Sequence, residues 1–134
     1  SAISGIVELV DIYPTLCELA DVPLPAHLEG TSFVPLLANP DAKWKRAAFG
    51  QQIIEGAKLM GYSVRTPRWR YVSWRSMADE TREAGRELYD LASPEGESRN
   101  VAEVPENAAR LERMQQLLSR GWRGALPREP VHSP

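Results

Sequence analysis

The sequence is poor in the residue types that most often build cross-linked, metal-binding or nucleophilic sites. Cys17 is the only cysteine among 134 residues, so an internal disulfide is excluded. His27 and His132 are the only histidines, and neither has a partner at a metal-ligand spacing such as H-x-x-x-H. No serine stands in a G-x-S-x-G elbow, the serine-hydrolase pattern that a sequence can reveal. We therefore expect no catalytic residue and no metal ligand in this chain.

A large excess of charge of either sign is also missing. The chain has 16 Lys and Arg against 18 Asp and Glu, a net charge of −2 and a pI of about 5.7. The run from Arg65 to Arg75 interleaves arginines with aromatic residues, which is one pattern of nucleic-acid surfaces. In an acidic chain without an RNP or zinc-finger pattern, the same run is more typical of a half-buried hairpin covered by arginine stems. We expect no nucleic-acid partner.

A long uncharged hydrophobic run is missing as well. The segment Ile3 to Ala20 is apolar, but it contains Glu8, Asp11 and Glu18 and has no basic leader. Neither a signal-peptide core nor a membrane span fits that pattern, so we expect no membrane partner. With 43% hydrophobic and 25% charged residues, the composition is that of a globular protein, and the length suffices for one domain with a core.

Helical spacing of apolar residues predicts a first helix within residues 3–21. Its start is open: with Asp11 as N-cap, Pro14 lies in the first turn, whereas a start near Ile6 puts Pro14 inside the helix and kinks it. Cys17 lies on this helix, where a buried, inert thiol is the usual state. An element this apolar needs partners on several sides. We infer from this that the chain is part of a larger body.

The middle of the chain predicts a loop and then a sheet. Pro23 and Pro25 end the first helix, a short helical turn is expected at residues 33–37, and the polar stretch 39–43 is the best domain boundary. Strands are expected at Arg46 to Gln52 and at Glu87 to Leu91, with a hairpin over Leu59 to Trp74 that breaks at Thr66-Pro67-Arg68. The charged segment Ser76 to Arg86 is predicted to be an exposed loop.

The last predicted element is a helix that opens at Pro105 and stops at Gly121. Its buried stripe consists of Ala108, Leu111, Met114, Leu117 and Leu118. Together with the strands, it gives an α+β fold in which a mostly antiparallel sheet carries one long helix across a face.

Six segments in order carry a resemblance to a known family. They are Val10 to Leu16 (V-D-x-x-P-T-L), Leu28 to Leu37 (L-x-G-x-S-x-x-P-L-L), Ala48 to Gln51, Met60 to Thr66, Glu87 to Asp90, and Asn100 to Ala102. In this order they resemble the C-terminal part of a sulfatase of the iduronate-2-sulfatase type, within the alkaline-phosphatase-like superfamily. Asp21 and Ser93 depart from the family pattern, which has Gly and Asp there.

The resemblance implies that residues 1–40 are the tail of a sulfatase catalytic domain. The apolar helix within them would come from the end of that larger α/β domain. Residues 41–134 would then be a C-terminal subdomain with about four antiparallel strands and a long helix. The implied parent is a sulfuric ester hydrolase that acts on sulfate esters, with sulfated sugars as one substrate class. It uses calcium and a formylglycine made in a C/S-x-P-x-R motif. That motif is absent here, since Cys17 is followed by Glu-Leu-Ala.

We therefore expect the chain to be an inactive fragment whose partner is the rest of the catalytic domain. Gln51 and Gln52, at the end of the first strand, are the candidates for substrate contact; ordinary strand-end polarity is the other interpretation. The alternative function is a free-standing α+β binding module. A third interpretation is one chain of a cleaved enzyme that stays bound to its other part. A fragment would expose the Ile3 to Ala20 segment and self-associate, whereas a module would be a monomer.

Overall fold

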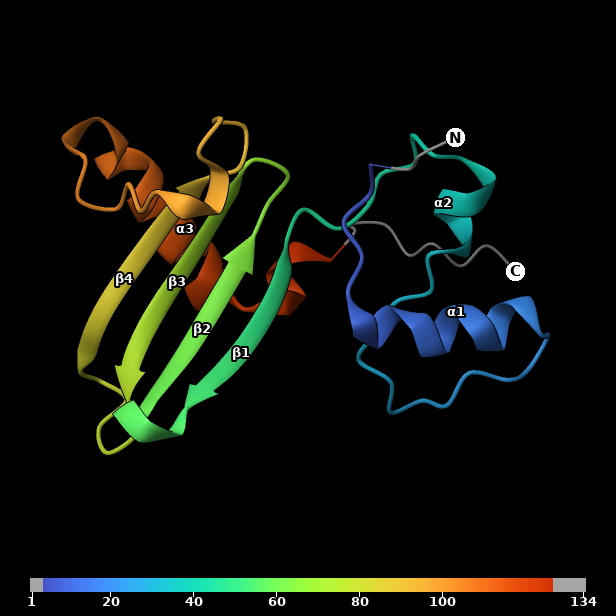
Figure 1. Cartoon of the computed structure of the whole chain (residues 1–134). Helices are drawn as coiled ribbons and strands as arrows, with labels where there is room; N and C mark the ends of the chain where they lie inside the picture. The colour runs from blue at the N-terminus through green and yellow to red at the C-terminus, as the bar shows by residue number, and fades with distance from the viewer. Residues whose placement is uncertain (1–3, 127–134) are drawn as a thin grey trace. The chain divides into compact units, whose positions relative to one another are not determined.

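The structure, a computed structural model, describes residues 4–126, and these form two compact units (Figure 1). The first unit contains the chain up to Arg46 together with Leu126, and the second contains Ala47–Ala125.

The first unit is built around one helix. A 3-10 turn, η1 (Leu9–Asp11), leads into α1 (Ile12–Leu19), and a short α2 (Val34–Ala38) follows a long loop. Pro14 is the third residue of α1, so the interpretation that places it in the first turn is confirmed. Asp11 precedes the helix as expected, but its carboxylate does not cap it. Asp21 adopts a left-handed conformation (φ 55°) just after α1, at the position where the sequence departs from glycine.

Large apolar side chains of this unit lie exposed. Leu9 is 86% exposed, and α1 presents further apolar residues to solvent: Ile12, Tyr13, Leu16 and Leu19. Cys17 on the same helix is buried, as predicted. Among the described residues, α1 therefore has one buried side, with Pro14, Thr15 and Cys17, and a further apolar surface that stays exposed. Within residues 4–126, no helix has both the length and the apolar character needed to cross a membrane.

The second unit is a four-stranded antiparallel sheet in the order β1-β2-β3-β4 (Figure 1). The strands are β1 (Ala48–Ile54), β2 (Leu59–Arg65), β3 (Trp69–Ser76) and β4 (Glu83–Asp90). The predicted hairpin is confirmed as β2 and β3, and the α+β fold class is confirmed with it.

Two predicted boundaries are wrong. The first strand extends to Ile54 rather than ending at Gln52. The loop predicted for residues 76–86 is a loop only in its first half, because β4 already begins at Glu83. Charged residues at the exposed end of that strand hide it from sequence patterns, since Glu83 and Arg86 pair with β3 across the sheet and need not be apolar.

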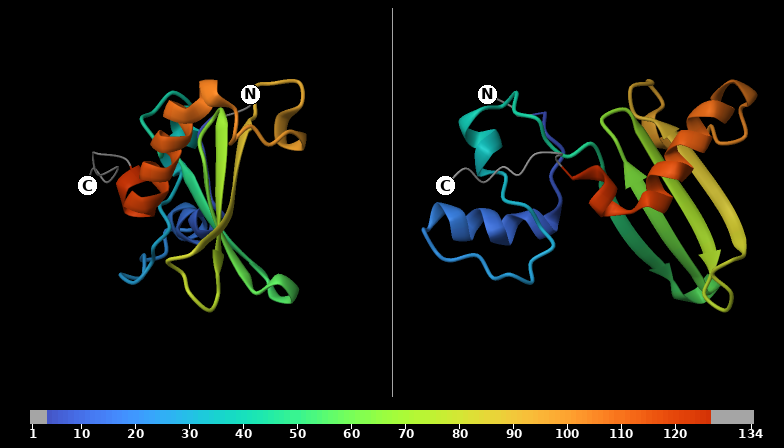
Figure 2. Two further views of the ribbon diagram at one scale, coloured as in Figure 1. Left: turned by 90° about the vertical axis from the view of Figure 1, so that its left-hand side faces the viewer. Right: turned by 180° about the vertical axis from the view of Figure 1, so that it is seen from behind.

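One face of the sheet carries the core. The helix α3 (Ala108–Arg120), preceded by a 3-10 turn that opens at Pro105, crosses this face (Figure 2). Leu111 and Met114 from α3 pack with the strand residues Val64, Tyr71 and Leu88. Gly121 ends the helix with a positive φ of 69°, as predicted.

The other face carries a different set of side chains, because neighbouring residues in a strand point to opposite sides. Two cross-strand rows make up its centre, and their members are Gly50, Ser63, Val72 and Glu87 in one row and Gln52, Gly61, Trp74 and Gly85 in the other. We call this surface of the second unit the open face. No α-helix among the described residues of that unit crosses it (Figure 2).

Candidate functional site

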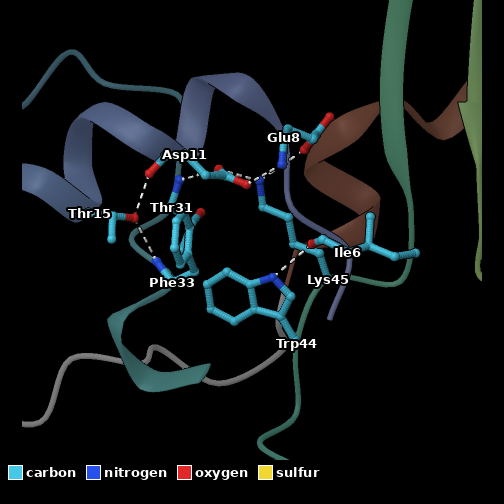
Figure 3. Close-up of polar contacts among 8 residues, drawn as sticks. All are labelled: Ile6, Glu8, Asp11, Thr15, Thr31, Phe33, Trp44 and Lys45. Atoms are coloured by element: carbon cyan, nitrogen blue, oxygen red, sulfur yellow. Dashed lines mark hydrogen bonds and ion pairs between the residues drawn. The ribbon is translucent and has the colours of Figure 1, made fainter. Parts of the chain in front are cut away.

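A buried ion cluster holds the first unit together (Figure 3). Lys45 lies between two carboxylates: its Nζ donates to Oδ1 of Asp11 at 2.6 Å and to Oε2 of Glu8 at 2.9 Å. The side chains of Lys45 and Asp11 are 2% and 0% exposed. Such a pair is stable only when its remaining polar atoms are also bonded, because burial removes the water that would otherwise solvate both charges.

The carboxylate of Asp11 meets this requirement. It accepts hydrogen bonds from the backbone N–H of Glu8 (2.9 Å) and of Thr31 (2.8 Å). Thr15 extends the network: its hydroxyl donates to the carbonyl of Asp11 at 2.6 Å and accepts from the N–H of Phe33 at 3.0 Å (Figure 3). The loop at residues 28–33 is thereby fastened to the start of α1.

Two further contacts tighten the same region. The indole N–H of Trp44 donates to the carbonyl of Ile6 at 2.9 Å. Gly30 approaches the backbone of η1 so closely that a Cβ there would collide with the carbonyl of Val10. Because its donors and acceptors bond to one another, the cluster holds a fold in place and offers no vacant group for chemistry.

The two glutamines predicted as substrate contacts lie on opposite faces of the sheet. Gln51 pairs with Tyr62, whose row belongs to the side covered by α3, whereas Gln52 pairs with Gly61 on the open face. Both are exposed. Gln52 borders a depression on the open face, so the structure separates two residues that the sequence treats alike.

The depression on the open face is a groove of about 160 Å³, lined by Gln52, Gly61, Ser63, Arg70, Val72, Trp74 and Glu87. The benzo ring of Trp74 lies across Gly61, where a Cβ would come within 2.9 Å of three ring carbons. A glycine is therefore required at this position for the indole to lie flat against the sheet. The ring remains partly exposed.

Glu87 fixes the indole in this position. Its carboxylate accepts from Nε1–H of Trp74 at 2.9 Å and from the hydroxyl of Tyr89 at 3.0 Å. Burial and the neighbouring Glu87 raise the pKa of Tyr89 above its ordinary value, so the phenol keeps its proton and remains a donor. On the same face, Arg70 forms an ion pair with Glu97 at 2.8 Å.

A larger hollow of about 650 Å³ lies on the helix side, between α3 and the β3–β4 loop. Its polar groups bond mainly to each other: Arg75 donates to the carbonyl of Glu80 at 2.9 Å, and the hydroxyl of Tyr62 donates to the carboxylate of Glu80 at 3.4 Å. This arrangement holds the β3–β4 loop against the sheet.

The remaining residues considered from the sequence do not gather into a site. His27 is exposed in a loop, and His132 lies outside the described residues. Within residues 4–126, no group of three His, Cys, Asp or Glu could hold a metal ion. In the basic and aromatic run, Trp69 is buried, and the guanidinium groups of Arg68 and Arg110 each lie 5.2 Å from its centroid. That indole has no free face on which a base could stack.

Sequence reasoning missed both the ion cluster and the groove. Asp11 was interpreted only as a helix cap, and no local pattern connects it with Lys45, 34 positions later. The groove had a usable signal: in Gly61-Tyr62-Ser63 and Val72-Ser73-Trp74, every second residue points to the same face.

Comparison with known proteins decides the family. A family model described as "N-sulphoglucosamine sulphohydrolase, C-terminal" matches residues 1–122. The chain belongs to this family of sulfatase C-terminal domains. It is 32% identical to human arylsulfatase K over 110 residues. The matched region covers 75% of this chain and 19% of that relative. The chain thus spans about one fifth of the length of the curated relatives it matches.

Solved structures agree on the fold of this sulfatase C-terminal domain. One is a protein in complex with its substrate D-glucosamine-2-N,6-O-disulfate, with a TM-score of 0.70 and 25% identity over 90% of the chain and 25% of that protein. Another is the phosphonate monoester hydrolase of Agrobacterium radiobacter, with a TM-score of 0.57 and 30% identity over 81% of the chain and 23% of that protein. The same C-terminal architecture therefore accompanies enzymes named for sulfate and for phosphonate substrates.

Proposed function

We propose that this chain is the C-terminal part of an enzyme, here called the parent, that hydrolyses sulfate esters, with sulfated sugars as the substrate class. The observation that carries the proposal is the family match over residues 1–122. The substrate class is supported by the structural relative solved with a sulfated glucosamine. The segment Met60 to Thr66, most of which lies in β2, supports the finer assignment to the iduronate-2-sulfatase type.

The proposed division of labour leaves the chemical step outside this chain. The C/S-x-P-x-R motif is absent from the sequence, so the formylglycine and the calcium ligands belong to the rest of the parent, and the chain alone is inactive. Residues 1–40 would be the tail of the catalytic domain and residues 41–134 the C-terminal subdomain. This chain would then contribute to the fold of the parent and to substrate contact.

Enzyme assays of the parent test this function. We expect release of inorganic sulfate from D-glucosamine-2-N,6-O-disulfate or from an aryl sulfate, and loss of that activity on removal of calcium by a chelator. A phosphonate monoester serves as the competing substrate, because one structural relative is named for that reaction. Hydrolysis of the phosphonate alone would replace the sulfatase assignment, and hydrolysis of neither would contradict the proposed function.

The exposed apolar surface of the first unit is proposed to pack against the rest of the catalytic domain. Its most exposed side chains are Leu9 (86%), Leu19 (61%) and Leu16 (58%). Without that partner, the same surface drives self-association, since contiguous exposed apolar patches bury themselves when they can. Analytical ultracentrifugation of the 134-residue chain should show concentration-dependent oligomers; a monomer at all concentrations would contradict this proposal.

Gln52 is proposed to contact substrate, and Gln51 provides its matched control. We expect Gln52→Ala in the parent to raise KM for a sulfated oligosaccharide by roughly three- to tenfold, since a hydrogen bond is worth about 0.5–1.5 kcal/mol. Gln51→Ala removes the same group from the adjacent position on the other face and should leave KM unchanged. Equal effects of the two changes, or no effect of Gln52→Ala, would support ordinary strand-end polarity instead.

A further inference from the structure

The groove on the open face combines one flat aromatic ring with a few fixed polar groups. The indole of Trp74 lies across Gly61 and is held by its hydrogen bond to Glu87. Ser63 and Gln52 line the groove beside it, and the hydroxyl of Ser63 donates to the carbonyl of Gly50 at 3.3 Å. An aromatic surface bordered by oriented polar groups can hold a small molecule in one orientation.

The geometry of these groups matches a sugar ring. One side of a pyranose is a sheet of C–H bonds that packs against an aromatic surface, while its hydroxyl groups need donors and acceptors at the rim. Trp74 supplies the surface, and the amide of Gln52 and the carboxylate of Glu87 supply both kinds of rim group. The groove, at about 160 Å³, lies below the roughly 300–1,000 Å³ of pockets for drug-sized ligands, which indicates a single ring.

Charge determines which kind of sugar fits. The only cation that lines the groove, Arg70, is already paired with Glu97 at 2.8 Å. The carboxylate of Glu87 accepts two hydrogen bonds from neutral groups, Trp74 and Tyr89. Three charged groups, one positive and two negative, leave the groove with a net charge of −1. A sulfate group would be repelled here, whereas a neutral hydroxyl donor would be attracted.

We propose that the groove formed by Trp74, Gly61, Gln52, Ser63 and Glu87 is a subsite for an uncharged sugar ring of a glycan substrate. This subsite rests on the proposed function for its biological role. Its ligand chemistry is argued from the groove itself.

Nuclear magnetic resonance of the 134-residue chain tests binding directly. The probes are an uncharged disaccharide, N,N′-diacetylchitobiose, and the anionic D-glucosamine-2-N,6-O-disulfate. We expect the uncharged probe at millimolar concentration to shift the indole N–H signal of Trp74, assigned from Trp74→Phe, and the anionic probe to leave it in place. Absence of a shift, or an equal shift with both probes, would overturn the proposal.

Kinetics of the parent test the role of the subsite in catalysis. Trp74→Ala should raise KM for a sulfated oligosaccharide about tenfold, the scale of one lost aromatic stacking contact. Tyr62→Ala removes an aromatic ring from the opposite face of the same sheet and should not change KM. Because Trp74→Ala also uncovers Gly61, the isosteric Glu87→Gln is the second variant, and we expect it to reduce the discrimination between uncharged and sulfated sugars.

The two proposals fail in different ways. A parent that is inactive on every sulfate ester, in a chain whose Trp74 signal still responds to the uncharged sugar, would contradict the sulfatase function and leave the subsite standing. An active parent whose KM is insensitive to Trp74→Ala and Glu87→Gln would contradict the subsite alone.

Discussion

Replacement of Asp11 by alanine is expected to unfold the first unit. The change leaves the buried ammonium of Lys45 with Glu8 as its one remaining ionic partner in the cluster, and it deprives the N–H groups of Glu8 and Thr31 of their acceptor. Removing one partner of a buried ion pair destabilises a protein by about 3–5 kcal/mol. That is comparable to the whole stability of a small folded unit, which is of the order of 5–15 kcal/mol.

Amide hydrogen exchange reports this loss residue by residue. We expect the N–H groups of Thr31 and Phe33 to lose protection in Asp11→Ala, while Leu88 in the second unit stays protected. Asp41→Ala is the control, since it removes an exposed carboxylate of the same unit and should change stability by less than about 0.5 kcal/mol. Unchanged protection of Thr31 in Asp11→Ala would show that the cluster contributes little to the fold.

Truncation of Leu88 to alanine should destabilise the second unit by about 2–5 kcal/mol, the range for a buried leucine whose cavity cannot collapse. Leu88, on the edge strand β4, is 0% exposed; it lies opposite Tyr71 and belongs to the core that α3 covers. Its backbone is held independently: its N–H donates to the side chain of Asn100 at 3.0 Å, and its carbonyl accepts from Val101 at 2.8 Å. The substitution therefore removes packing without breaking these bonds.

Urea denaturation measures the effect of Leu88→Ala as a shift of the midpoint. Ile53→Ala on β1 is the matched control, because it also shortens an aliphatic strand residue, but one that is 51% exposed. We expect its midpoint to move only slightly. Similar shifts for the two variants would mean that the buried Leu88 contributes no more to stability than an exposed strand residue does.

The sequence predicted most of the second unit, because its elements are specified locally. The last helix is marked by Pro105 at its start, by the apolar stripe along one face, and by Gly121 at its end. The hairpin of β2 and β3 is equally local, with a Pro-containing turn between two strands rich in valine and aromatic residues. Local signals were weaker for β4, whose first half is exposed and charged.

The polar groupings could be predicted only in part. The proximity of Asp11 and Lys45 depends on the path of the intervening loop, which no spacing rule encodes. Gln52 was singled out for its place at a strand end, but its partners in the groove come from three other segments of the chain. The difference between Gln51 and Gln52 follows from strand alternation alone and required only the knowledge that β1 continues to Ile54.

The ion cluster also determines where this polypeptide tolerates division. The polar stretch 39–43 looks like a natural place to divide the chain. However, Lys45 is buried in the first unit and Ala47 in the core of the second. A recombinant piece that ends at residue 40 would retain Asp11 as a buried acid without its counterion. A piece that begins at residue 41 would contain Lys45 without its two carboxylate partners, Glu8 and Asp11. Arg46 is the single position between these two anchors, so expression boundaries for either half should be set there.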